Sequence, residues 1–105
     1  MITPLMVSVL ATYGSCYPVR LPTARYDYAP THYVRYVYVD YWDVQAECRA
    51  LGVHTDRYGR IMDCGKRNLV ILPRVDGVNI DARMQRCLRR HEEGHANGWG
   101  PFHED

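Results

Sequence analysis

The hydrophobic pattern of this chain changes its period along the sequence, and each period predicts a different secondary structure. Residues 32–41 combine β-branched and aromatic side chains on two mixed faces, which is typical of an edge strand or a one-sided sheet. Residues 68–72 form a continuous apolar run that indicates a more central strand, and residues 80–96 have a helical period. The chain therefore predicts an α+β domain in which a small antiparallel or mixed sheet packs against one long C-terminal helix.

The predicted C-terminal helix carries one apolar stripe that is about 100° wide. Asn79 or Asp81 can cap its first turn, and Gly98 after Asn97 can end it, because glycine adopts the left-handed conformation at low cost. Two histidines complete the stripe at its C-terminal end. Its members are Ile80, Met84, Cys87, Leu88, His91 and His95.

Shorter signals describe the segments between these elements. Three prolines make residues 17–30 an extended segment, and residues 42–51 predict a short helix or turn. A hairpin turn is expected at residues 56–62, and the dipeptide Asp76-Gly77 predicts a further turn.

Size and charge restrict the class of protein. The chain has 105 residues, enough for one domain with a thin core, and residues 17–105 are expected to form it. Thirteen basic and twelve acidic residues leave a net charge of +1, so no nucleic-acid partner held by bulk charge is expected. No apolar stretch approaches the ~20 residues of a membrane-spanning helix.

Residues 1–16 have two interpretations. The mostly apolar run 2–14 is followed by Ser15 and Cys16, as in a short secretion signal that ends in a lipid-attachment cysteine. That interpretation predicts an exported, periplasmic or envelope-associated protein that meets a membrane only through its lipid anchor. The alternative is a strand at residues 6–12 in the domain's own sheet, and a cytoplasmic location also stays open.

The four cysteines favour a disulfide over a zinc knuckle, because no two of them form a C-x-x-C pair. Cys48 and Cys64 lie in turn-rich surroundings, and a bond between them would stabilise a small domain by roughly 3 kcal/mol in an oxidising compartment. Two buried free thiols are the alternative. Cys87 falls within the helical pattern and is expected to fill space in the core.

The strongest chemical signal is the pentapeptide HEEGH at residues 91–95. Histidines at positions i and i+4 share one helix face, so His91 and His95 can converge on one metal ion. Glu92 is rotated by about 100° from His91, where it can contact only a water on that ion and accept its proton. The pattern predicts Zn²⁺ as the cofactor and Glu92 as the general base.

A third protein ligand is expected after the helix. Gly98 ends the helix, and residues 98–102 have the reach to bring His103 back to the first two histidines. The alternatives for this third position are Glu104, Asp105 and His54. Trp99 is expected to pack over the helix end or to wall a substrate pocket.

These residues resemble known groups of proteins. The H-E-x-x-H motif resembles the zincin metallopeptidases, and the stretch HEEGHANGWGPFH is similar to a set of small, largely uncharacterised bacterial proteins with an H-E-x-x-H-x-N-G-W segment and a later histidine. The stretch is also similar to the metzincin pattern through Gly98, but Pro101 stands where that family has its third histidine. The resemblance covers about the last 25 residues. It implies a minimal zincin-like domain in which the two helix histidines bind zinc and Glu92 is the base.

Functions from different classes follow from these signals. The first is a zinc-dependent hydrolase, a metallopeptidase acting on a peptide or protein, which Glu92 favours because a structural zinc site has no use for a base. The second is a non-catalytic, zinc-stabilised accessory protein of the envelope, of conjugation or of a phage, which the short chain favours. The third is an anion-binding module that uses helix arginines without a metal. Those arginines are Arg83, Arg86, Arg89 and Arg90.

Overall fold

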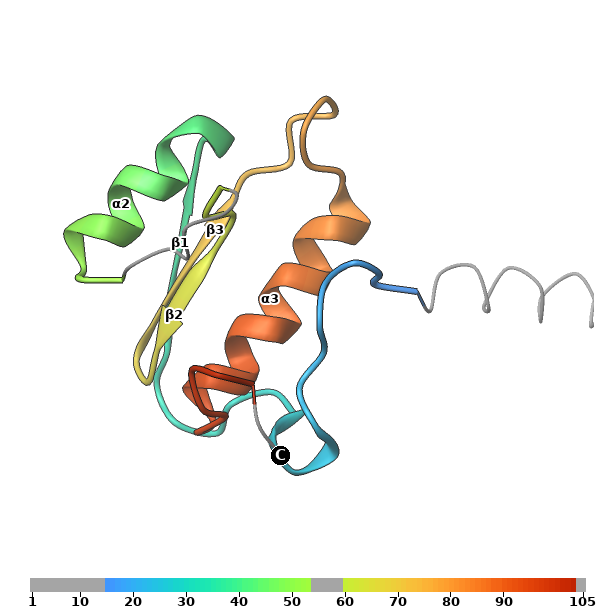
Figure 1. Ribbon diagram of the computed structural model, residues 1–105, viewed down its shortest axis with the longest axis vertical. Coiled ribbons are helices and arrows are strands. Elements are labelled where there is room, and N and C mark those ends of the chain that lie inside the picture. Colours follow the sequence, from blue (N-terminus) through green and yellow to red (C-terminus); the bar gives the residue numbers. More distant parts are fainter. Residues whose placement is uncertain (1–14, 54–59, 104–105) are drawn as a thin grey trace, which may run out of the picture.

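The computed structural model describes residues 15–53 and 60–103. Within these ranges a three-stranded sheet lies between two helices, α2 (Val44–Ala50) and α3 (Ala82–Ala96), as Figure 1 shows. The predicted α+β class and the long C-terminal helix are therefore confirmed. The N-terminal strand and most of the hairpin turn that the sequence suggests lie outside the described residues.

The sheet is mixed, with the strand order β1-β3-β2. β1 (Arg35–Val39) runs parallel to β3 (Leu69–Pro73), whereas β2 (Cys64–Lys66) is antiparallel to β3. β3 lies at the centre, as its continuous apolar run predicts. A strand with neighbours on both edges and both faces needs apolar side chains at nearly every position.

β1 lies at an edge of the sheet, which confirms one of the two alternatives that its mixed faces predict. The other alternative, a one-sided sheet, is wrong, because a helix covers each face. Val37 and Val39 of β1 pack into the core that α2 covers. Tyr36 and Tyr38 pack on the opposite face, in the core that α3 covers. The reason is that tyrosine has an apolar ring with a polar tip. The Tyr36 ring is partly buried while its hydroxyl donates a hydrogen bond to Glu93 Oε2 at 2.6 Å.

The two ends of α3 are formed by residues that the sequence indicates. Asp81 is the N-cap, and its side chain accepts a hydrogen bond from a backbone N–H of the first turn. At the other end Gly98 has a φ of 108°, and its N–H donates to the carbonyl of His95. The next N–H, that of Trp99, donates to the carbonyl of Gly94. These two bonds make a Schellman motif, which turns the chain back over the helix end.

The segment of residues 15–28, called the N-terminal arm from here on, lies along α3 (the blue segment beside α3 in Figure 1). A disulfide between Cys16 and Cys87 joins the arm to the helix, with the two Cα atoms 5.5 Å apart. The expectation that Cys87 only fills the core is therefore wrong, because a buried half-cystine has the same pattern as an apolar residue. The bond also takes up the Cys16 thiol, which lipid attachment would require, so the two roles exclude each other.

A second disulfide joins Cys48 in α2 to Cys64 in β2, with the Cα atoms 6.0 Å apart. This is the pair suggested by the turn-rich surroundings of the two residues. All four cysteines are bonded, and two disulfides fit an oxidising, extracellular environment. Among the described residues, no helix is both long and apolar enough to cross a membrane.

Replacing both Cys48 and Cys64 by alanine is expected to lower the free energy of unfolding by about 3 kcal/mol, because the unfolded chain gains the freedom of an open loop. The loop has a sequence separation of 16 residues. Urea denaturation of the variant and the wild type under oxidising conditions measures the difference. As a control, thiol titration of the denatured, unreduced wild type is expected to find no free thiol. An unchanged urea midpoint would contradict the prediction.

Candidate metal centre

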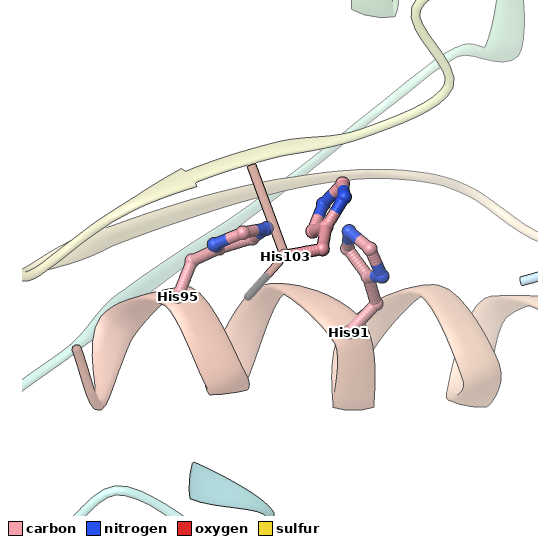
Figure 2. A group of neighbouring side chains, drawn as sticks. All are labelled: His91, His95 and His103. Carbon is pink, nitrogen blue, oxygen red and sulfur yellow. The ribbon is translucent and has the colours of Figure 1, made fainter. Parts of the chain in front are cut away.

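Three histidine rings meet above one face of α3 (Figure 2). His91 and His95 lie one turn apart on the helix, and His103 comes from the segment that follows it. The ring centroids are 4.9 to 5.0 Å apart in all three pairs. One nitrogen of each ring lies within 4.8 Å of the other two, so the group could hold one metal ion. Nitrogens on a tetrahedral zinc ion lie about 3.3 Å apart, so each pair of nitrogens would have to approach by at most about 1.5 Å.

Hydrogen bonds to the backbone decide which nitrogen of each helix histidine faces the centre. The Nδ1 of His91 bonds to the carbonyl oxygen of Arg20, and the Nδ1 of His95 bonds to the carbonyl oxygen of Trp99 at 2.9 Å. A carbonyl oxygen only accepts, so each Nδ1 carries a proton and donates it. In the neutral ring the Nε2 atom then keeps its lone pair. Histidines that bind metals have this arrangement, in which the second hydrogen bond orients the ring.

The backbone of His103 has a left-handed conformation, with a φ of 60°. This conformation costs roughly 1 kcal/mol for a residue with a Cβ atom, although histidine adopts it more often than most. The N–H of His103 donates to the carbonyl of Gly100 and so closes the turn after α3. Backbone strain of this kind concentrates at functional sites. Here the residue with the left-handed backbone, His103, carries the imidazole that lies beside the rings of His91 and His95.

Trp99 supports the centre from beside His95. Its indole is 2% exposed and stacks on the His95 ring, with centroids 4.9 Å apart and an angle of 21° between the planes. The carbonyl of the same residue accepts the Nδ1 proton of that ring. Trp99 therefore orients His95 in two ways. It packs over the helix end and also lines the cleft described below.

Glu92 is buried, with 4% of the residue exposed, and its carboxyl group is hydrogen-bonded to Asp63, the residue before β2. A Cβ atom on Gly65 would lie 2.7 Å from Glu92 Oε1, so the glycine in β2 leaves the room that the carboxyl group occupies. Ligand atoms of Asp63, His91 and Glu92 also lie within 4.8 Å of one another. Glu92 therefore has a side-chain partner that the sequence did not indicate, and its contact with a metal-bound water stays a prediction. Asp63 was missed because no sequence spacing links it to the motif.

Burial changes the proton affinity of the site. It raises the pKa of Glu92 well above the ordinary value of 4.5, and the charge of Asp63 raises it further. Burial also raises the pKa of Asp63, while the hydrogen bond to Glu92 acts in the opposite direction. Two carboxyl groups this close resist losing both protons, so the second proton leaves the pair at a higher pH than it would leave an isolated carboxyl group. Burial lowers the pKa of His95, which favours the neutral imidazole that a metal needs.

The three histidines and the carboxyl pair line one cleft of about 820 Å³. Its walls come from α3, from β2 and the residues before it, from the N-terminal arm, and from the segment after α3. This volume lies in the range of ligand-binding clefts, about 300–1,000 Å³. Arg20, Arg60 and Lys66 also line the cleft, so its charges outside the carboxyl pair are positive. The cleft is therefore large enough for a ligand that contacts the histidines and the carboxyl pair.

The helix arginines make contacts within the chain. Three of the four have such a partner, namely Arg83 with Ser15, Arg89 with Glu93, and Arg90 with Asp27. These contacts give the arginines a structural role and leave the anion-binding interpretation without support from the described residues. The alternative third ligands lie outside the described residues, and they are His54, Glu104 and Asp105.

Comparison with known proteins identifies no relative. No protein-family model, no curated protein and no solved structure matches this chain. The zincin resemblance therefore rests on the motif at residues 91–95, and the functional argument rests on the geometry of the site.

In the metal-free protein, Glu92→Gln is expected to remove a pH dependence of stability. A carboxyl group whose pKa is raised by folding stabilises the fold fully below its unfolded pKa, here 4.5, and this contribution is lost as the pH rises toward the folded pKa. The wild type should therefore lose stability relative to the variant as the pH rises above about 5. Urea denaturation with a chelator present measures both proteins. A constant difference, or one that grows toward acid pH, would contradict the prediction.

Proposed function

We propose that this protein is a zinc-dependent hydrolase, a metallopeptidase that cleaves an amide bond in a peptide or protein substrate. The observation that carries the proposal is the pair of Nδ1 hydrogen bonds of His91 and His95, which leaves both Nε2 atoms for an ion beside His103. Histidines that only fill space on a helix face would not need to direct their Nε2 atoms to one common point. The buried carboxyl group of Glu92 in the same cleft supplies the acid–base chemistry.

The donor set suits zinc. Three neutral imidazoles are a ligand set that zinc accepts in catalytic sites, with a further position left for water or substrate. His91, His95 and His103 would hold the ion on one wall of the cleft. When bound, zinc polarises the scissile carbonyl and lowers the pKa of a water that it coordinates to about 7.

Glu92 moves the protons in this proposal. Its carboxylate accepts a proton from the attacking water and then donates it to the nitrogen of the leaving amine. The hydrogen bond with Asp63 and the space above Gly65 restrain the carboxyl group on the sheet side of the cleft. A raised pKa suits this exchange, because the group must both take and release a proton near neutral pH. The positive lining residues favour substrates with acidic side chains.

The two disulfides support a location outside the cytoplasm. Cytosolic reductants keep most thiols reduced, whereas all four cysteines of this chain are bonded. We therefore propose an exported protein, in the periplasm or associated with the envelope. The disulfide between Cys16 and Cys87 uses the thiol that a lipid anchor at Cys16 would need.

A second function, a non-catalytic zinc-stabilised accessory protein, is favoured by one observation. Asp63 Oδ2 is buried and has no hydrogen-bond partner among the described residues. Asp63 also offers an oxygen close to the ligand atoms of His91 and Glu92. As a fourth ligand it would close the coordination sphere, and a zinc ion with four protein ligands is structural.

Glu92→Gln is expected to keep zinc and to lower kcat/KM by about 10²–10⁴-fold, because it removes the base and no ligand. His95→Ala is expected to lose most of the zinc, together with the increase in melting temperature that bound zinc provides. Metal analysis, melting with and without zinc, and hydrolysis of a quenched fluorescent peptide library measure these properties.

Glu93→Gln is the matched control for these variants. It neutralises the neighbouring glutamate, whose carboxylate contacts Tyr36 and Arg89 rather than the cleft, so zinc content and hydrolysis should not change. Loss of zinc from Glu92→Gln alone would contradict the assignment of the base. Zinc binding without any hydrolysis, combined with loss of zinc from Asp63→Asn, would replace the hydrolase by the accessory function.

Zinc is expected to be retained at pH 8 and lost as the pH falls below about 6, because protons compete with the ion for the imidazoles. Equilibrium dialysis across this range, followed by metal analysis, measures the loss. His103→Ala should begin to lose zinc at a higher pH than the wild type, since two imidazoles hold the ion more weakly than three. Identical curves for the two proteins would exclude His103 as a ligand.

A further inference from the structure

The N-terminal arm contacts α3 at successive turns of the helix. Cys16 is bonded to Cys87, and the carbonyl of Arg20, four residues along the arm, accepts the Nδ1 proton of His91, four residues along the helix. The order of contacts on the arm thus follows the order on the helix. The arm is therefore held in one register against the face of α3 that carries the metal centre.

Further contacts hold the arm against the helix beyond Arg20. Pro22 is buried against Gly94, where a Cβ atom would lie 2.3 Å from Pro22 Cγ. The side chain of Asn97, the C-cap residue, donates to the carbonyls of two arm residues at 3.0 and 2.8 Å. Asp27 departs from this order, because it pairs with Arg90, the residue before His91. A glycine at position 94 is thus required by the close approach of the arm. Together with the contacts of Cys16 and Arg20, these contacts join six residues of the arm to α3 and its C-cap.

We propose that the N-terminal arm is a positioning element of the metal centre, and that the Cys16–Cys87 disulfide makes metal affinity depend on the redox state of the protein. The inference rests on the metal site of the proposed function. The disulfide is the covalent link between arm and helix, and it lies one helical turn from His91. It therefore fixes the arm close to the carbonyl that orients the first ligand.

The disulfide acts on the metal through Arg20. When the arm is anchored, the carbonyl of Arg20 already holds the His91 ring in the orientation that presents Nε2. When the bond is open, the arm and the ring must be ordered as the metal binds, and this loss of entropy weakens binding. Removing a hydrogen-bond partner of a ligating histidine typically lowers metal affinity by about 10–100-fold.

A dithiol reductant is the class of reagent that would open the bond. One of its thiolates attacks a cysteine sulfur, the S–S bond breaks, and a mixed disulfide forms. The second thiol of the reagent displaces the remaining cysteine. Two electrons and two protons pass to Cys16 and Cys87, which become thiols, and the reagent is left as its own disulfide. The oxidised protein is the form with high metal affinity.

The test compares two double variants, each lacking one disulfide. Cys16→Ser/Cys87→Ser frees the arm, whereas the matched control Cys48→Ser/Cys64→Ser removes the bond between α2 and β2 and leaves the arm attached. The zinc dissociation constant is measured by competition with a chromophoric chelator. Long-range ¹H–¹⁵N NMR spectra of the metal-free proteins report which nitrogen of His91 carries the proton.

The arm variant is expected to raise the zinc dissociation constant by about 10–100-fold and to lose the preference of His91 for the Nδ1 proton. The control should keep the Nδ1 proton of His91 as in the wild type. Because Cys64 also lines the cleft, its zinc dissociation constant can rise, but by less than that of the arm variant. Gly94→Ala, with both disulfides intact, displaces Pro22, and its Cβ atom would also lie 3.1 Å from Trp99 Cε3. It should weaken zinc binding and also lower the preference of His91 for the Nδ1 proton, which displacement of Trp99 alone would not do. This second readout keeps the test valid if the arm variant fails to fold.

The outcomes separate this inference from the proposed function. If the oxidised wild type does not bind zinc, the proposed function is wrong. If the wild type binds zinc and Gly94→Ala and the arm variant bind it equally well, the inference alone is overturned. Equal weakening in the arm variant and the control would also overturn it, because a general loss of rigidity would then explain the effect.

Discussion

The candidate metal centre depends on one constraint. An imidazole that donates through Nδ1 to a carbonyl presents Nε2 as its lone-pair nitrogen. Neither carbonyl lies within α3. One belongs to Arg20 in the N-terminal arm and the other to Trp99 after the Schellman turn. The helix therefore spaces the two rings but does not orient them. Their orientation depends on the chain segments that precede the sheet and follow the helix, so the whole fold contributes to the centre.

The features that could be predicted from the sequence are those set by local spacing. The limits of α3, its stop at Gly98 and the shared face of His91 and His95 depend on residues within one or two helical turns. The Cys16–Cys87 bond, the contact of Asp63 with Glu92 and the Arg20 carbonyl join distant segments, and no periodicity encodes such pairs. The burial of Glu92 could not be predicted either, since an acidic residue on a mixed helix face has the pattern of an exposed one.

The carboxyl pair is difficult to explain as a device for stability. Burying Asp63 and Glu92 side by side raises the pKa of both, which means that the folded state disfavours their charged forms. Apolar side chains at such positions generally stabilise a fold at least as well. Gly65 has no side chain, and this absence leaves room for the Glu92 carboxyl group. A cation beside the pair would reverse the electrostatic cost, so the arrangement is better suited to a loaded centre than to an empty one.

Small size links the stability of this domain to its chemistry. The three-stranded sheet supports two separate clusters of buried residues, one toward α2 and one toward α3, and each cluster is anchored near a disulfide. A core this thin leaves α3 without a large apolar partner on its outer side. The N-terminal arm provides part of that cover through Pro22, and the same segment carries the carbonyl that orients His91. The contacts that pack the arm on the helix therefore also orient the candidate ligand His91, so the packing of α3 and the orientation of this ring depend on the same segment.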